Sequence, residues 1–210
     1  MATDARESLP RDAQGVIRLT TPLVEATTRA LRVGDQLLVD GHIWGIRDAT
    51  LIQIFDRGET PSVDLSGAIL LHVAPSVKRR PDGGYDPVSV GTTTSSRMER
   101  FTAGCLGQLG ARAIVGKGGF SDAALPVLQR LGGVYLAIVG GAASPETLQV
   151  EEIEAVYYKE LMPECLWQFR VKGFGPLFVT MDTHGESAYH DVREQAGKNL
   201  QDAYARLGIE

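Results

Sequence analysis

Cysteine is scarce in this 210-residue chain, and the two that occur, Cys105 and Cys165, lie far apart in the sequence. Neither belongs to a CxxC pair or a Cys/His cluster, so this chain alone lacks the ligand spacing of a zinc or iron–sulfur site. We therefore predict no metal site in this chain. Two free thiols are typical of a protein in a reducing compartment, and we expect a cytoplasmic location.

Long hydrophobic runs are also missing. No apolar stretch approaches the roughly 20 residues that a helix needs to cross a bilayer. The opening stretch, MATDARESLPRDAQG, is polar and has no apolar core of the kind found in a signal peptide. We expect no contact with a membrane.

A basic run is the third absence. The formal charge is -5, and the 21 Lys and Arg residues are interspersed with 26 Asp and Glu residues. Nucleic-acid binding needs clustered cations that displace counterions, so this balance argues against a nucleic-acid partner. A small anionic substrate remains compatible, because one local pocket can be positive on an acidic protein.

The composition is that of a folded domain with a substantial core, since 43% of the residues are hydrophobic. We predict a flexible N-terminal tail over residues 1–14 and a single domain over residues 15–210. The first third is β-rich, and the remainder alternates strand and helix patterns. The fold class is therefore α/β, with a layer of irregular or barrel-like strands leading in.

Local signals place the elements. Asp40-Gly41 between two β-rich runs predicts a hairpin, and residues 49–59 predict a short helix that ends near Gly58. The apolar run 68–75 predicts a buried strand, and residues 76–87 predict a surface hairpin loop.

After Val90, helical spacing covers residues 96–110, and short buried strands are expected over 111–119 and 134–143. Between these strands, Ser121 is the expected N-cap of a helix that stops at Gly132. Further predictions are a helix that begins at Ser144-Pro145-Glu146 in SPETLQVEEIEAV, two strands over 166–182, and an amphipathic helix from Ser187 to Leu207.

Hydroxyl groups are dense in the stretch VSVGTTTSSRMERF, residues 88–101, and an arginine follows them. Arginine grips a carboxylate through a planar fork, so Thr93 and Arg97 are candidates for an anion site. The alternative is that Thr94 or Ser95 simply caps a helix. The residues themselves leave both interpretations open.

Two glycine-rich turns, VGKGG and VGGAA, follow predicted strands, and ligands of α/β sheets bind beyond the carboxyl ends of strands. The spacing around Lys117 departs from the phosphate-binding P-loop, which argues against an NTPase. Lys117 is either a cation held by a tight turn for a carboxylate or an ordinary surface lysine. Arg47 is likewise either a ligand-binding group or half of a surface salt bridge.

The remaining reactive side chains give no motif. The four histidines, which are His42, His72, His184 and His190, show no metal-ligand spacing, and His184 is expected in a turn with a structural role. Cys105 falls on the apolar face of a helix, where a core role is expected.

Several blocks in one order resemble a known family. These blocks are GTTTSSRM, VGKGG, GGAA, QVEEIEAV, FGPLFV and DTHG. In this order they resemble the β subunit of L(+)-tartrate dehydratase and the C-terminal β region of the class I iron–sulfur fumarases. The resemblance extends from LTTP to DTHG, nearly the whole chain.

The resemblance implies a swivelling β/β/α fold and one half of a hydro-lyase that acts on small 2-hydroxy dicarboxylates. The other half is an α subunit that carries a 4Fe–4S cluster, and the implied assembly is a hetero-oligomer. Carried over to this sequence, Thr93 is the catalytic base, whereas Arg47, Arg97 and Lys117 bind the substrate carboxylates.

Three positions depart from the family pattern: Thr92 replaces a proline, Leu51 replaces a histidine, and a glycine is absent at Leu161-Met162. Dehydration of L(+)-tartrate to oxaloacetate is the favoured activity. Alternatives are a fumarate/malate or mesaconate-type hydratase and, from another class, a stand-alone dicarboxylate-binding or assembly module.

Overall fold

The computed structural model describes residues 6–141 and 143–208. The described chain is a mixed α/β protein whose main sheet has the strand order β1-β2-β3-β6-β7-β9-β8. These strands are β1 (Ile17–Thr20), β2 (Gln36–Ile46), β3 (Ile69–His72), β6 (Ala113–Gly116), β7 (Val134–Ile138), β8 (Val150–Tyr157) and β9 (Leu166–Met181). A separate hairpin consists of β4 (Ser76–Arg79) and β5 (Tyr85–Ser89).

The main sheet closes on itself. Strands β2, β3, β6 and β7 are parallel neighbours, and the long strand β9 runs antiparallel to both β7 and β2. The five strands therefore form a ring of backbone pairing, in which β2 and β3 from the first part of the chain are joined by β6, β7 and β9 from the remainder, so the barrel-like strands are not confined to the leading part.

Both faces of the ring are buried. Alternate residues of one strand enter different cores: Ile69 and Leu71 belong to one apolar cluster, and Leu70 belongs to another. Parallel strands covered on both faces have continuous apolar sequences, which is why residues 68–75 show no alternation.

Helices, all of them short except the last one, form the connections, and several contribute to the second apolar cluster. They are α1 (Glu25–Ala30), α2 (Asp48–Leu51), the π-turn η1 (Ile52–Asp56), η2 (Ser96–Phe101), α3 (Thr102–Gly107), η3 (Asp122–Ala124), α4 (Leu125–Leu131), α5 (Ala143–Leu148), η4 (Lys159–Leu161) and α6 (Ala188–Leu207). Cys105 on α3 is 1% exposed, which confirms its core role.

Several predicted elements are confirmed. The hairpin over residues 76–87, the buried strand at β3 and the helices near residues 49–59 and 96–110 are all present. Gly132 ends α4 in the left-handed conformation at φ 66°, as its sequence position predicted. His184 lies in a turn, and its Nε2 is 2.8 Å from the Arg29 carbonyl oxygen, a structural contact.

The predicted hairpin at Asp40-Gly41 is wrong, because β2 continues through these residues. Gly41 has φ 100° and lies where the pairing of β2 with β9 changes register. The Asp40 carboxylate accepts hydrogen bonds from Arg18 and from the Gly173 backbone N–H, which hold the irregularity inside the sheet. The Asp-Gly pair thus forms a bulge rather than a turn.

Three other predictions need correction. The helix that begins near Ser144 ends at Leu148, and residues 150–157 form strand β8, which pairs antiparallel with β9 and buries Val150 and Ile153 in the core. On the exposed side, Arg170 of β9 pairs with the carboxylates of Glu151, Glu152 and Glu154. The two strands expected over 166–182 are one continuous strand, β9. Ser121 occupies the expected N-cap position, but its side chain makes no capping hydrogen bond and donates its hydroxyl to Glu99.

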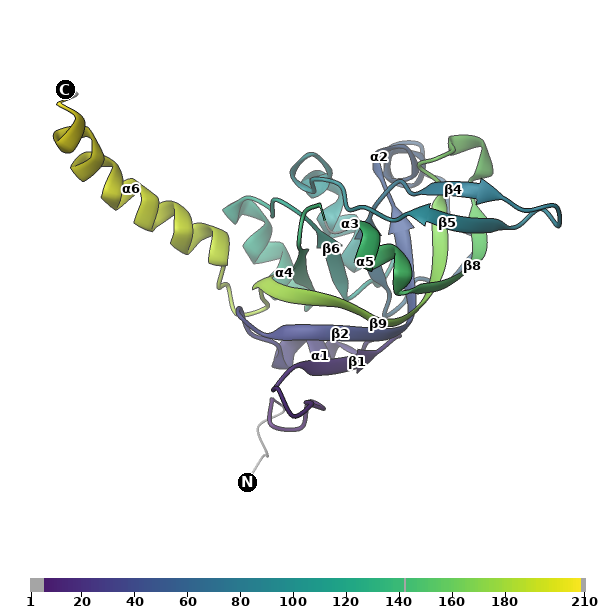
Figure 1. Cartoon of the computed structure of the whole chain (residues 1–210), viewed down its shortest axis with the longest axis horizontal. Coiled ribbons are helices and arrows are strands. Elements are labelled where there is room, and N and C mark those ends of the chain that lie inside the picture. Colours follow the sequence, from purple (N-terminus) through teal and green to yellow (C-terminus); the bar gives the residue numbers. More distant parts are fainter. Residues whose placement is uncertain (1–5, 142, 209–210) are drawn as a thin grey trace.

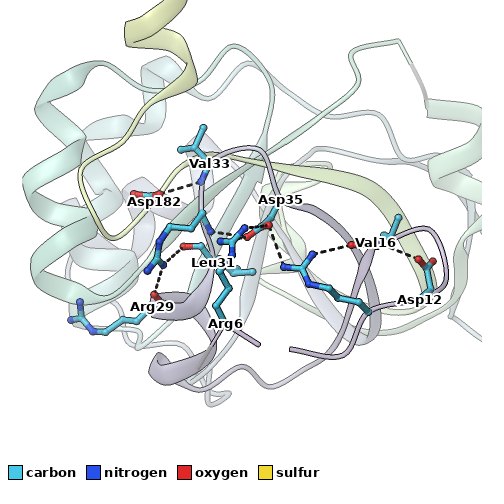
Figure 2. A network of polar contacts seen from close by, with 11 residues as sticks. Arg6, Asp12, Val16, Arg29, Leu31, Val33, Asp35 and Asp182 are labelled. Carbon is cyan, nitrogen blue, oxygen red and sulfur yellow. Dashed lines mark hydrogen bonds and ion pairs between the residues drawn. The ribbon is translucent and has the colours of Figure 1, made fainter. Parts of the chain in front are cut away.

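The tail expected over residues 1–14 lies partly outside the described residues, at 1–5. Within 6–14, Leu9 is buried, and Arg6 donates two hydrogen bonds to Asp35 at 2.8 and 3.1 Å. Arg11 lies 3.5 Å from the same carboxylate, which also accepts from the Arg32 backbone N–H. Figure 2 shows that these contacts gather around Asp35.

The C-terminal helix α6 extends away from the sheet and its covering helices (Figure 1). Ser187 caps it by accepting from the His190 backbone N–H, and its first turns contact Asp122 through His190 and Arg193. This confirms the helix expected from Ser187 to Leu207. Within the described residues, no helix is long and apolar enough to cross a membrane.

Candidate functional site

The candidate residues gather at one edge of the ring. Strands β2, β3, β6 and β7 are parallel, so their carboxyl ends share an edge. Arg47 directly follows β2 and Lys117 directly follows β6. The loop with Thr93 joins this edge through bridges Val73–Thr92 and Thr94–Lys117.

Arg47 and Arg97 meet at one carboxylate, that of Asp48. The Arg97 Nε lies 2.9 Å and 3.1 Å from the two Asp48 oxygens, and the Arg47 Nε lies 3.2 Å from Oδ2. Burial acts to raise the pKa of Asp48, but the hydrogen bonds and charges of the arginines outweigh it and hold the pKa below its usual range. Asp48 is therefore ionised and orients both guanidinium groups.

A second carboxylate fixes the Arg47 loop. Glu164 Oε1 lies 3.4 Å from the Arg47 Nε, and its Oε2 accepts from the Ala49 backbone N–H at 2.8 Å. The Thr50 hydroxyl donates to the Glu164 carbonyl oxygen. Two of the departures from the family pattern therefore concern this region: Leu51 is fully buried in the core, and Leu161-Met162 precede Glu164.

The backbone of Thr93 is held between the carboxyl ends of β3 and β6. Its N–H donates to the His72 carbonyl at 2.8 Å, and its carbonyl accepts from the Lys117 N–H at 3.5 Å. The Ser95 N–H donates to the Lys117 carbonyl at 3.0 Å. These bonds bring Thr93 and Lys117 together on adjacent loops, and both side chains remain partly exposed.

Ser95 is not a helix cap. It is completely buried, and its hydroxyl lies 2.8 Å from His72 Nδ1 and accepts from the Tyr135 hydroxyl at 2.9 Å. A Cβ on Gly116 would lie 1.9 Å from the Ser95 oxygen, so only glycine leaves room for this contact. The capping interpretation is therefore wrong for Ser95, whose hydroxyl belongs to a buried polar network beneath the loop.

His72 is the neutral member of this network. Burial lowers its pKa to about 3, Asp48 acts to raise it, and Arg97 acts to lower it. The imidazole is thus uncharged at neutral pH. The His72 carbonyl holds Thr93, and its ring contacts Ser95, two residues before Arg97, so the threonine loop and Arg97 are anchored on the same residue.

The chain's own donors do not fit a 4Fe–4S cluster. Among the described residues, no group of three or more His, Cys, Asp or Glu side chains could hold a metal ion. Cys105 and Cys165 are both buried, and burial raises their thiol pKa values to about 12 and about 11. Cluster ligation requires thiolates on neighbouring cysteines.

The structure therefore brings Arg47 and Arg97 together at Asp48, and Thr93 and Lys117 together on adjoining loops. Sequence reasoning missed Asp48 and Glu146, a buried carboxyl beside Thr92 and Lys117, and considered Ser95 only as a helix cap. Asp48 was visible as the residue after Arg47. Nothing in the sequence shows which distant groups the other two meet.

The fold and this edge define a mixed α/β domain in which Arg47, Arg97 and Lys117 lie at the carboxyl ends of parallel strands. The family described as Fumarase C-terminus matches residues 2–192, and the chain belongs to that family. This finding confirms the resemblance seen in the sequence.

Individual relatives are consistent with this family assignment. The chain is 38% identical over 170 residues to "L(+)-tartrate dehydratase subunit beta" of Escherichia coli strain K12, covering 80% of this chain and 84% of that protein. It is 35% identical over 185 residues to "Putative L(+)-tartrate dehydratase subunit beta" of Methanocaldococcus jannaschii, covering 86% and 94%.

A longer relative is "Putative fumarate hydratase class I" of Geobacillus stearothermophilus. The chain is 37% identical to it over 186 residues, which are 88% of this chain. The chain spans only 36% of the length of that protein.

Proposed function

We propose that this chain is the β subunit of a two-subunit hydro-lyase that acts on a small 2-hydroxy dicarboxylate, with L(+)-tartrate to oxaloacetate favoured. The observation that carries the proposal is the convergence of Thr93, Arg47, Arg97 and Lys117 at one sheet edge. Relatives named as tartrate dehydratase β subunits support the same activity.

The arginines are arranged to bind carboxylates. Both contact Asp48 through Nε, and within the described residues neither Nη edge of Arg47 or Arg97 takes part in a hydrogen bond. A guanidinium fixed at Nε still presents its planar fork of N–H donors, which matches a carboxylate. Lys117 on the neighbouring loop supplies a third positive charge for the second carboxylate or for charge that develops in the transition state.

Thr93 is the proposed base. Dehydration removes a weakly acidic C–H proton beside a carboxylate, so the base must be placed accurately and must itself be acidified. The backbone bonds of Thr93 to His72 and Lys117 supply the placement. The cations of Arg97 and Lys117 favour an alkoxide, because nearby positive charge lowers the pKa of a hydroxyl.

The proposed partner is an α subunit that carries a 4Fe–4S cluster, as the resemblance to tartrate dehydratase β subunits implies; the buried cysteines of this chain do not fit such a cluster. The cluster would supply a Lewis acid for the leaving hydroxyl. The roles of this chain are to bind and orient the dicarboxylate and to take up the proton. The two buried free thiols support a cytoplasmic location for the assembly.

Fumarate or malate is the second candidate substrate. The relative from Geobacillus stearothermophilus carries the fumarate hydratase name at 37% identity, close to the 38% of the tartrate dehydratase subunit of Escherichia coli. The arginine pair and Lys117 bind carboxylates, which all of these substrates share. A mesaconate-type substrate differs only by a methyl group.

Anaerobic co-expression with a three-cysteine α subunit tests the proposal. The assembled enzyme is assayed on L-tartrate, malate and mesaconate, and the highest kcat/KM is expected for L-tartrate. Arg97→Lys should raise KM about 10-fold or more, because a lysine cannot replace the planar fork. A complex that assembles and has no hydratase or dehydratase activity would contradict the proposal.

A further inference from the structure

Glu146 on α5 is a buried carboxyl group that the proposed function does not use. It is 2% exposed, and neither carboxyl oxygen has a hydrogen-bond partner within residues 6–141 and 143–208. Carboxyl groups are rarely buried without a partner, since desolvation disfavours the charge and an unmet hydrogen bond costs further free energy. A role that involves gain and loss of a proton accounts for such a group.

Helix α5 is fixed against the loop that carries Thr93. The Val90 backbone N–H donates to the Thr147 hydroxyl at 2.8 Å, one residue beyond Glu146. A Cβ on Gly91 would lie 3.1 Å from the Ala143 Cβ, so the loop and the helix are in close contact. These contacts hold the Glu146 carboxyl beside the Thr92 backbone and Lys117.

Opposing effects set the charge of Glu146. Burial raises its pKa to about 7, whereas the dipole of the nearby Thr92 backbone N–H, which does not reach hydrogen-bond geometry, and the Lys117 ammonium act to lower it. Among the described residues, Lys117 is the charged side chain that acts on this carboxyl. Glu146 therefore exchanges its proton near neutral pH, and its proton affinity depends on the Lys117 charge.

On the basis of the proposed function, we propose that Glu146 is a proton-binding residue of the dicarboxylate site, where a bound dicarboxylate and a proton on Glu146 favour each other. A dianion at Lys117 offsets the ammonium charge and repels the Glu146 carboxylate. The bound anion must then raise the proton affinity of Glu146, and by linkage the proton must raise the affinity for the anion to the same extent. The proton comes from solvent.

The direction of the pH effect follows. Small dicarboxylates are mainly dianions from about pH 6 upward, because carboxyl pKa values lie near 4 and the charge of the first carboxylate raises the pKa of the second only in part. The arginines and Lys117 keep their charge over this range, and His72 stays neutral because burial lowers its pKa to about 3. Affinity for a dicarboxylate is therefore higher at pH 6, where Glu146 is protonated, and falls as pH rises through its pKa.

Succinate, an unreactive dicarboxylate, is a suitable probe. Its affinity for the full chain, alone and assembled with the α subunit, is measured by calorimetry at pH 6 and pH 8. We expect the wild-type affinity to fall about threefold or more, which corresponds to a pKa change of about 0.5. Glu146→Gln should bind equally well at both pH values, whereas the matched control Glu151→Gln, on the exposed Arg170 cluster, should keep the wild-type behaviour.

A carbon-13 titration of the Glu146 carboxyl in the wild-type chain tests the coupling without any substitution. Its pKa should rise in succinate, and Lys117→Met should also raise it. If succinate binds and neither its affinity nor the Glu146 titration shows the coupling, the inference fails and the proposed function stands. If succinate binds to neither form of the protein, both fail.

Discussion

Thr93 is positioned by its backbone, through bonds at 2.8 Å to the His72 carbonyl and at 3.5 Å from the Lys117 N–H. A substitution that changes only the side chain should therefore leave the loop in place. This separation makes Thr93 a favourable residue for testing chemistry apart from structure.

Thr93→Ala in the assembled enzyme should lower kcat by roughly 100- to 10,000-fold, the range of a lost acid–base group. KM should change little, because the group acts mainly in the transition state. Steady-state kinetics provide the check, with Thr93→Ser as the control that retains a hydroxyl and part of the rate. Near-normal turnover of the alanine variant would exclude Thr93 as the base.

Ser95 is the buried residue that anchors the Thr93 loop to the core, through His72 and Tyr135. Ser95→Ala removes the group that both His72 and the Tyr135 hydroxyl contact and leaves these two polar groups buried without that partner. The free energy of unfolding should fall by about 1–3 kcal/mol. Thermal denaturation should show a lower Tm, by about 2–4 °C for each kcal/mol in a chain of this size.

The exposed neighbour provides the control for this prediction. Ser96→Ala alters a hydroxyl at the surface and should leave Tm nearly unchanged. Equal Tm values for the Ser95 and Ser96 variants would mean that the buried network contributes nothing to stability.

At the scale of elements, the sequence predicts that a helix or strand is present better than it predicts where that element ends. Buried strands and the helix from Ser187 have local signals, and they were predicted well. Asp40-Gly41 has the local signal of a turn, but its carboxylate is held by Arg18 and Gly173, which are distant in the sequence. Likewise, residues 150–157 form a strand because their backbone pairs with β9 and the side chains of Val150 and Ile153 enter the core. Such tertiary contacts override local preference.

The same distinction applies to the site. Thr93, Arg97 and Lys117 could be proposed from residue types and from the blocks in which they occur. Their partners could not, since Arg97 meets Asp48 on α2 and Ser95 meets Tyr135 on β7 only after the sheet has closed. Because ligands of α/β sheets bind beyond the carboxyl ends of the strands, the sequence predicts which loops lie together. It does not predict which side chains of those loops form hydrogen bonds.

The attachment of α6 should depend on pH. A hydrogen bond to Asp122 raises the pKa of His190 above its ordinary value. A raised folded-state pKa means that this contact stabilises the fold fully below the unfolded value of about 6.5, and the contribution is lost as pH rises through the folded pKa. Hydrogen-exchange protection of the first turn of α6, corrected for intrinsic rates, should therefore be higher at pH 6 than at pH 8.

Asp122→Asn is the control for this helix. It removes the carboxylate that His190 and Arg193 share, so the difference in protection between pH 6 and pH 8 should disappear. Protection that is independent of pH in the wild-type chain would contradict a role for the His190 contact in holding α6.

For the whole molecule, the important property is that the proposed site is open. The Arg97 side chain is 47% exposed and that of Arg47 is 29% exposed, and Thr93 and Lys117 are also partly accessible. Charged groups stabilise a transition state most effectively where water is excluded. Under the proposed function, a single chain with its cations at the surface supplies the residues of half a site and lacks the enclosure.

The isolated chain should therefore contain no iron and show no dehydratase activity on L-tartrate, malate or mesaconate. Its buried cysteines are unsuited to cluster ligation, and its open face cannot exclude water. Metal analysis and a coupled assay under anaerobic conditions check both statements, with the co-expressed α and β subunits as the positive control. Turnover by the purified chain alone, at a rate that Thr93→Ala abolishes, would place a complete active site in this chain and would overturn the two-subunit proposal.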